Sequence, residues 1–198
     1  MLGSLKLGST STSITLTPSD ANITSSFMLP QVAETIMPEE DRPEIYGPIP
    51  GDSGSGATNY GYLYNWPAAT AGATTTGVTS GSAPHSICPA GWRLPTGGVY
   101  ESGQGEFAEL DRLFGGAGNY QNSGPSETKW GYDGPFKGVF AGYARYSIMS
   151  SGNYGSLWSS TTSNMSTYAA AMTIQSGYLS PTGYAQRMEG LAVRCLVN

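Results

Sequence analysis

Few residues of this chain have the types and spacing that enzyme chemistry requires. The one histidine, His85, lies in the loop-like stretch SAPHSICP without a Ser-Asp pattern nearby, so we expect a surface residue and not a general base. The glycine-rich stretch GGAGNYQNSG, residues 115–124, lacks the Lys-Ser/Thr of a phosphate-binding loop. The sequence therefore predicts no catalytic residue, no metal site and no cofactor.

Three carboxylates, Glu106, Glu109 and Asp111, occur close together in EFAELDRLFGG, residues 106–116. This stretch has helical periodicity, and Gly115 is placed to end the helix in a left-handed conformation. The predicted apolar face consists of Phe107, Leu110, Leu113 and Phe114. We therefore expect the carboxylates to lie on the opposite, solvated face and to take no part in catalysis.

The two cysteines, Cys88 and Cys195, lie far apart in the sequence and have no metal-binding spacing. Two interpretations remain open: each thiol is buried as a small apolar side chain, or the pair forms a disulfide that closes the domain. The alternating pattern of GLAVRCLVN, residues 190–198, predicts a last strand that returns beside the early strand containing Cys88.

The composition favours a β-rich α+β fold and argues against several classes of function. The 198 residues include 28 Gly, 13 Pro and 13 Tyr, with only 12% charged residues, which is typical of short strands and turns. The net charge of −5 argues against nucleic-acid binding, because phosphate contacts need a basic surface. No apolar run is long enough for membrane insertion, and MLGSLKLGSTSTS does not resemble a signal peptide.

The texture of the sequence divides the chain into three parts. Residues 1–46 carry short alternating stretches such as SITLTP, and they predict an appendage for attachment or oligomer formation, because short strand pairs are marginal alone. Residues 47–59 are rich in Gly, Pro and Ser and predict a linker. Residues 60–198 form the main domain, in which AAAMTIQSGYLSP predicts two strands around a turn at residues 175–177.

A long uncharged segment gives the strongest indication of function. No Asp, Glu, Lys, Arg or His occurs from Tyr146 to Gln186, and Ser, Thr, Tyr, Asn and Gly dominate. The same residue types dominate antibody paratopes, where Tyr supplies rigid contact area and Ser, Gly and Asn supply adaptable hydrogen bonds. The alternative is that these residues form polar strands and turns without a ligand.

Several motifs, in order along the chain, resemble a known family. They are GYLYNW (61–66), CPAGWRLPT (88–96), EFAEL (106–110), GVFAGYAR (138–145), LWSST (157–161) and AVRC (192–195). Over about residues 60–198 the chain resembles the paralogous domain abundant in Fibrobacter and Bacteroidetes surface proteins. It is also similar to the variable proteins of diversity-generating retroelements. The resemblance implies a C-type lectin-like fold, with Trp66, Trp92 and Trp158 in the frame and the two cysteines at the positions of a framework pair.

Two activities found in related folds are not implied by this resemblance. The Glu-Pro-Asn, Gln-Pro-Asp and Trp-Asn-Asp motifs that bind calcium and sugar in true C-type lectins are absent from the sequence. Formylglycine-generating enzymes need catalytic cysteines, whereas both cysteines here match the framework pair.

The uncharged segment and the resemblance lead us to expect a non-enzymatic receptor-binding or adhesion protein, diversified by a retroelement and displayed on a phage tail or a cell surface. Its expected partner is a host cell-surface protein or glycan, and its expected state is a homo-oligomer such as a homotrimer. The alternative is a structural module of a bacterial surface or fimbrial protein without a dedicated ligand site. The predicted ligand-binding residues are Tyr143, Arg145, Ser147, Asn153, Tyr154, Ser163, Asn164, Ser166, Tyr168, Ala170, Tyr178, Ser180, Thr182 and Tyr184.

Overall fold

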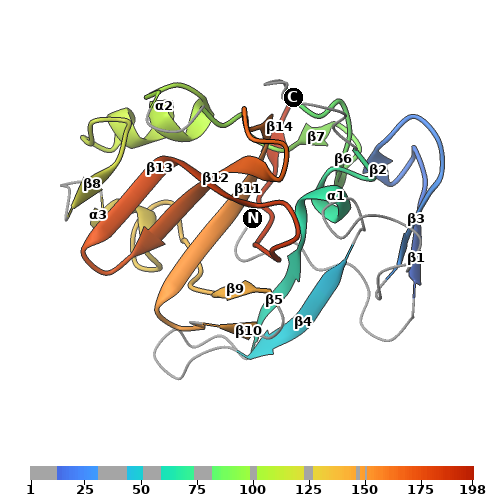
Figure 1. Cartoon of the computed structure of the whole chain (residues 1–198), viewed down its shortest axis with the longest axis horizontal. Coiled ribbons are helices and arrows are strands. Elements are labelled where there is room, and N and C mark those ends of the chain that lie inside the picture. The colour runs from blue at the N-terminus through green and yellow to red at the C-terminus, as the bar shows by residue number, and fades with distance from the viewer. Residues whose placement is uncertain are drawn as a thin grey trace.

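Among the described residues, the largest sheet has four antiparallel strands in the order β11-β12-β13-β8 (Figure 1). Its strands are β8 (Gln121–Asn122), β11 (Tyr154–Thr162), β12 (Tyr168–Gln175) and β13 (Tyr178–Gln186). The structure, a computed structural model, describes residues 13–30, 44–50, 59–73, 82–98, 102–122, 127–145, 148–149 and 151–198.

Antiparallel strand pairs and short helices make up the rest of the described fold (Figure 1). The pairs are β1 (Ser13–Leu16) with β3 (Phe27–Pro30), β2 (Ala21–Asn22) with β6 (Ser86–Pro89), β4 (Ile45–Pro50) with β5 (Asn59–Tyr64), β7 (Trp92–Arg93) with β14 (Leu196–Val197), and β9 (Tyr143–Ala144) with β10 (Ile148–Met149). The helices are α1 (Trp66–Ala69), α2 (Glu106–Leu113) and α3 (Glu127–Trp130). The class is therefore the predicted β-rich α+β fold. None of the described helices has the length and apolar character needed to cross a membrane.

The hairpin of β12 and β13 turns where the sequence predicted it. Gln175 pairs with Tyr178, and Ser176 and Gly177 form the turn between them. Gly177 has a φ of 76°, a left-handed conformation that glycine adopts without steric cost.

Buried tryptophans join the sheet to the preceding segments. Trp66 and Trp158 are fully buried in one apolar cluster, as expected for frame residues, and Trp92 packs half-buried against the same cluster. The Trp158 indole N–H donates to the Tyr64 carbonyl at 2.6 Å, and the Trp66 indole N–H donates to the Ser159 carbonyl at 3.0 Å. Each ring therefore buries its apolar surface and satisfies its polar edge.

Described residues of the amino-terminal segment contribute to the same core. Leu16, Ala21 and Leu29 are buried in the cluster that contains the two tryptophans. Residues 47–50, which were expected to belong to a linker, lie in β4 and extend its pairing with β5. Apolar burial therefore joins these described residues to the main core, while residues 51–58 of the predicted linker lie outside the described residues.

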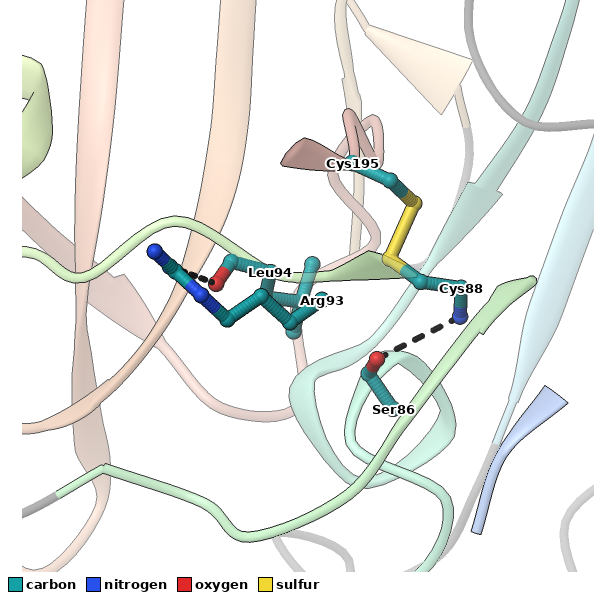
Figure 2. Close-up of a disulfide and its surroundings, with 5 residues drawn as sticks. All are labelled: Ser86, Cys88, Arg93, Leu94 and Cys195. Carbon is teal, nitrogen blue, oxygen red and sulfur yellow. Dashed lines mark hydrogen bonds between the residues drawn. A yellow bond between two sulfur atoms is a disulfide. The ribbon is translucent and has the colours of Figure 1, made fainter. Parts of the chain in front are cut away.

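A disulfide links Cys88 to Cys195, with a Cα–Cα distance of 5.8 Å across 107 positions of sequence (Figure 2). This settles the two interpretations of the cysteines in favour of the bond. Cys88 lies in β6, where its backbone N–H donates to Ser86 Oγ at 3.3 Å. Both cysteines are buried, so the bond joins β6 to the end of the chain inside the core.

The last residues form a shorter strand than the sequence predicted. Only Leu196 and Val197 form β14, which pairs with β7 and not with the strand of Cys88, and Val197 is 63% exposed. The preceding residues are buried but irregular, with single bridges from Leu191 to Tyr64 and from Ala192 to β11.

Helix α2 ends as predicted but exposes a different face. Gly115 has a φ of 93° and follows the last turn, as its position indicated. Leu113, predicted to be buried, is 80% exposed, whereas Asp111 is fully buried. Glu106 is also not simply solvated, because it forms an ion pair with Arg93. The apolar face is therefore rotated so that the helix buries one carboxylate.

Candidate functional site

The strands of the uncharged segment are mostly buried, which places many of its hydroxyl groups in the frame. Residues 155–163 and 169–174 are buried. Ser156 Oγ donates to the Met172 carbonyl at 2.9 Å, and Ser159 Oγ donates to another β12 carbonyl at 2.8 Å. At these positions backbone carbonyls of the neighbouring strand satisfy the hydroxyl groups inside the sheet, so these hydroxyls are not available to a ligand.

The turn between β11 and β12 is an exposed part of this segment. Residues 164–167 are exposed, and a buried cation holds them from beneath. The Arg187 guanidinium donates to the Ser166 carbonyl at 3.2 Å, and the backbone N–H of Arg187 donates to the Thr167 carbonyl at 2.9 Å. Arg187 is 1% exposed, with its guanidinium carbon 4.9 Å from the Trp66 ring centroid. The turn is therefore fixed to the frame.

Two tyrosines flank the exposed turn. The Tyr168 and Tyr184 rings meet edge to face with centroids 5.1 Å apart, and Tyr184 is 39% exposed. The side-chain amide of Gln186 donates to the Tyr168 hydroxyl at 3.2 Å. Asn164, Ser166, Tyr168 and Tyr184 are hereafter called the tyrosine turn surface.

A second group of tyrosines lies near the other end of the sheet. Tyr143 and Tyr154 have ring centroids 5.4 Å apart, and Tyr120 and Tyr178 have centroids 5.2 Å apart. Burial raises the pKa of Tyr154 and of Tyr178 above the ordinary value of tyrosine. Both phenols are therefore neutral at physiological pH and can donate hydrogen bonds.

The predicted residues do not form one continuous surface. Tyr178 pairs with Gln175 at one end of β12, whereas Tyr184 pairs with Ala170 near the other end. The tyrosine turn surface and the second group are therefore two separate candidate regions. Asn153, which is exposed, belongs to the second region, because it directly precedes Tyr154.

Four of the predicted ligand-binding residues are buried in the structure. Ser163, Ala170, Ser180 and Thr182 are 7%, 3%, 2% and 1% exposed. Alternation along a strand exposes every second residue only when one face is open, and here the sheet is covered on both faces. Ala170, for example, packs closely against Gly97: a Cβ added at Gly97 would lie 2.7 Å from the Cβ of Ala170. Arg145 is half-buried, and Ser147 lies outside the described residues.

A groove of about 660 Å³ lies at the Gln175 end of the sheet. Most of its lining residues were not predicted from the sequence as site residues. Its polar lining includes Thr128, Tyr132, Asp133, Asn153, Gln175 and Ser176. Of these, only Asn153 was predicted as a site residue. A sequence signal existed in WGYDGPF, residues 130–136, where Tyr and Asp are placed between a tryptophan and a Gly-Pro turn.

The described residues contain no group of three or more His, Cys, Asp or Glu that could hold a metal ion. His85 is half-buried, and its Nε2 lies 3.5 Å from Thr24 Oγ1.

The geometry defines a disulfide-linked, β-rich domain that presents tyrosines and amides at the two ends of a buried sheet. Comparison with models of known protein families identifies the family of this domain. The chain belongs to the Fibrobacter succinogenes major domain family, whose model matches residues 33–196. No curated protein and no solved structure has significant similarity to the chain.

Proposed function

We propose that this protein is a non-enzymatic receptor-binding or adhesion protein whose tyrosine turn surface contacts a ligand on a host cell. The observation that carries the proposal is the Tyr168–Tyr184 pair beside the exposed turn, held on the frame by buried Arg187. Tyrosines presented on a rigid support lose little entropy on binding, and neighbouring Asn and Ser side chains can adapt their hydrogen bonds.

The finer assignments belong to the same proposal. We infer that the domain has a C-type lectin-like fold and that the protein is a variable protein diversified by a retroelement. It is displayed on a phage tail or a cell surface as a homo-oligomer such as a homotrimer. Membership of the Fibrobacter domain family and the buried frame of Trp66, Trp158 and the disulfide support the fold assignment. The ligand is a host cell-surface protein or glycan.

One observation favours a second candidate function, a structural module of a bacterial surface or fimbrial protein. Most Ser and Thr side chains of β11 to β13 are buried, so the unusual composition is largely explained by the frame. The exposed turn then remains the part of the segment that distinguishes the two functions.

Cell binding tests the choice between them. Fluorescently labelled protein is incubated with a panel of bacterial strains, and binding is measured by flow cytometry. If the tyrosine turn surface binds the ligand, joint replacement Tyr168→Ala and Tyr184→Ala should lower the affinity at least about tenfold, because aromatic hot spots contribute about 2 kcal/mol or more. Tyr120→Ala is the matched control, since Tyr120 is 41% exposed and lies beside Tyr178, away from the turn.

Two outcomes would contradict the proposal. Wild-type protein that binds no strain would favour the structural module. Binding that survives the double replacement but is lost in Tyr120→Ala would move the ligand to the second group of tyrosines.

A further inference from the structure

The groove at the Gln175 end of the sheet has the size and shape of a small-molecule site. Its volume of about 660 Å³ falls within the range of roughly 300–1,000 Å³ that is usual for ligand pockets. One wall is the loop after α3, and the other is formed by the two residues just before β11 and by the β12–β13 turn, which lies near α3 in Figure 1. Ile174 and Phe140 contribute apolar lining between these walls.

The loop after α3 is held rigidly by its own backbone. Trp130, at the end of α3, is fully buried, and its carbonyl accepts from the Gly138 N–H at 3.1 Å. The Phe136 N–H donates back to the Lys129 carbonyl, also at 3.1 Å. A Cβ at Gly134 would lie 2.3 Å from the Thr128 carbonyl oxygen, so this close return of the chain requires glycine. The loop's own backbone contacts therefore set its shape.

A strained residue closes this loop, and a cation holds it in place. Lys137 has a φ of 55°, a conformation that non-glycine residues adopt only at an energetic cost. The Arg194 guanidinium donates to the Lys137 carbonyl at 3.1 Å and lies 4.1 Å from the centroid of the Phe136 ring. Arg194 thus fixes the loop from the side of the core, and the loop presents Tyr132 and Asp133 at the groove.

The polar side chains of the groove are not engaged with one another. Tyr132 is 39% exposed, and Asp133 and Asn153 are exposed. None of the side chains of Asp133, Asn153 and Gln175 forms a hydrogen bond with another residue that the structure describes. These groups are therefore available to a ligand. The amides of Asn153 and Gln175 can each donate and accept hydrogen bonds, and the carboxylate of Asp133 can accept them.

This combination of groups suits a particular class of ligand. An exposed tyrosine ring offers a negative face on which the C–H groups of a sugar ring can stack. Carboxylate and amide side chains accept from and donate to pairs of adjacent hydroxyl groups. Among the described lining residues, Asp133 is the one charged side chain, so a phosphate, sulfate or sialic acid would meet repulsion without a compensating cation.

We infer that the groove between Tyr132, Asp133, Asn153 and Gln175 binds a neutral oligosaccharide without a metal ion. The sugar ring stacks on Tyr132, and Asp133, Asn153 and Gln175 bind its hydroxyl groups. The site is separate from the tyrosine turn surface, because Gln175 and Ala170 lie towards opposite ends of β12. It therefore goes beyond the proposed function and can be tested separately from it.

The test uses four defined probes: cellotetraose, mannotetraose, xylotetraose and tetra-N-acetylchitotetraose. Each is titrated into the full-length protein in the presence of EDTA, and the affinity is measured by calorimetry and ligand-observed NMR. We expect at least one probe to bind. Tyr132→Ala and Asp133→Ala should each weaken that binding at least tenfold, whereas Tyr132→Phe, which keeps the ring, should stay within threefold of wild type. The control Met28→Ala, which removes an exposed side chain of β3 outside both candidate regions, should stay within twofold.

Three results would overturn the inference: no binding of any probe by the wild type, binding that EDTA abolishes, or binding that Tyr132→Ala leaves unchanged. Thermal melts of the variants show whether Tyr132→Ala remains folded. If Tyr132→Ala does not fold, the test rests on Asp133→Ala, which replaces an exposed side chain. Loss of sugar binding would leave the cell-binding test of the tyrosine turn surface unaffected. Conversely, failure of that cell-binding test would leave the result for the groove intact.

Discussion

The indole N–H of Trp130 donates a hydrogen bond to Oδ1 of Asp111 over 3.0 Å, and both side chains are fully buried. The other carboxylate oxygen of Asp111 accepts from the backbone N–H of Gly118 at 2.8 Å. One buried carboxylate thus ties helix α2 to the end of α3 and to the segment between them. The groove loop starts at this point, so its position depends on the Asp111–Trp130 contact.

Replacing Asp111 by Ala should lower the free energy of unfolding by about 2–4 kcal/mol, because it leaves buried donors on Trp130 and Gly118 without an acceptor. Glu109→Ala is the matched control, since Glu109 is an exposed carboxylate of the same helix and its loss should cost no more than about 0.5 kcal/mol. Urea unfolding at neutral pH measures both values. Equal stabilities for the two variants would show that the buried contacts of Asp111 contribute nothing net.

Reduction of the Cys88–Cys195 disulfide should destabilise the protein by roughly 2–5 kcal/mol, because the bond closes a long loop and restricts the unfolded chain. Thermal melts with and without reductant measure the effect. The double variant Cys88→Ala and Cys195→Ala is the control, since its melting temperature should not respond to reductant. A wild type whose melting is equally insensitive would contradict the prediction.

The ion pair between Arg93 and Glu106 should make part of the stability sensitive to acid. Two hydrogen bonds of 2.6 and 2.7 Å from Arg93 lower the pKa of the Glu106 carboxyl below its usual 4.5, and the Thr96 backbone N–H contributes further. A lowered pKa in the folded state means that this stabilisation is complete above the unfolded pKa and is lost as the pH falls through the folded value. Burial raises the pKa of Glu189, which titrates in the opposite sense.

The comparison of wild type with Glu106→Gln isolates this contribution from that of Glu189. The difference in the free energy of unfolding should be largest near neutral pH and should shrink as the pH falls below about 4.5. Denaturant unfolding at a series of pH values measures it. A difference that stays constant from neutral to acid pH would mean that the carboxylate charge is not what stabilises this contact.

Features that depend on local sequence were predictable. Gly115 ends α2 and Gly177 turns the β12–β13 hairpin because the left-handed conformation at both positions suits glycine and little else. The burial of Trp66 and Trp158 was implied by the family resemblance and agrees with the size and apolar surface of their side chains. In each case a short stretch of chain contains the physical cause.

Features that depend on distant partners were not predictable in the same way. Asp111 is buried because Trp130 and Gly118 supply donors, and helical periodicity alone placed it on the solvated face. The burial of Ser180 and Thr182 requires knowledge that both faces of the sheet are covered. The groove arises from the meeting of the α3 loop with Asn153 and Gln175, which no single motif contains.

The uncharged segment itself should separate into positions that hold the fold and positions that bind. Trp158 fills the core and donates to the Tyr64 carbonyl, so Trp158→Ala should cost about 3–5 kcal/mol through the cavity and the lost hydrogen bond. Asn164→Ala and Ser166→Ala remove exposed side chains, so each should change the free energy of unfolding by no more than about 0.5 kcal/mol. Ser163 is buried and accepts a hydrogen bond from the Met165 N–H, so Ser163→Ala should lower the free energy of unfolding by more than either of these changes. Thermal and chemical unfolding of the single variants measure this order. Large losses at Asn164 and Ser166 would identify the turn as framework, and the tyrosine turn surface would then have to be abandoned as a site for ligands.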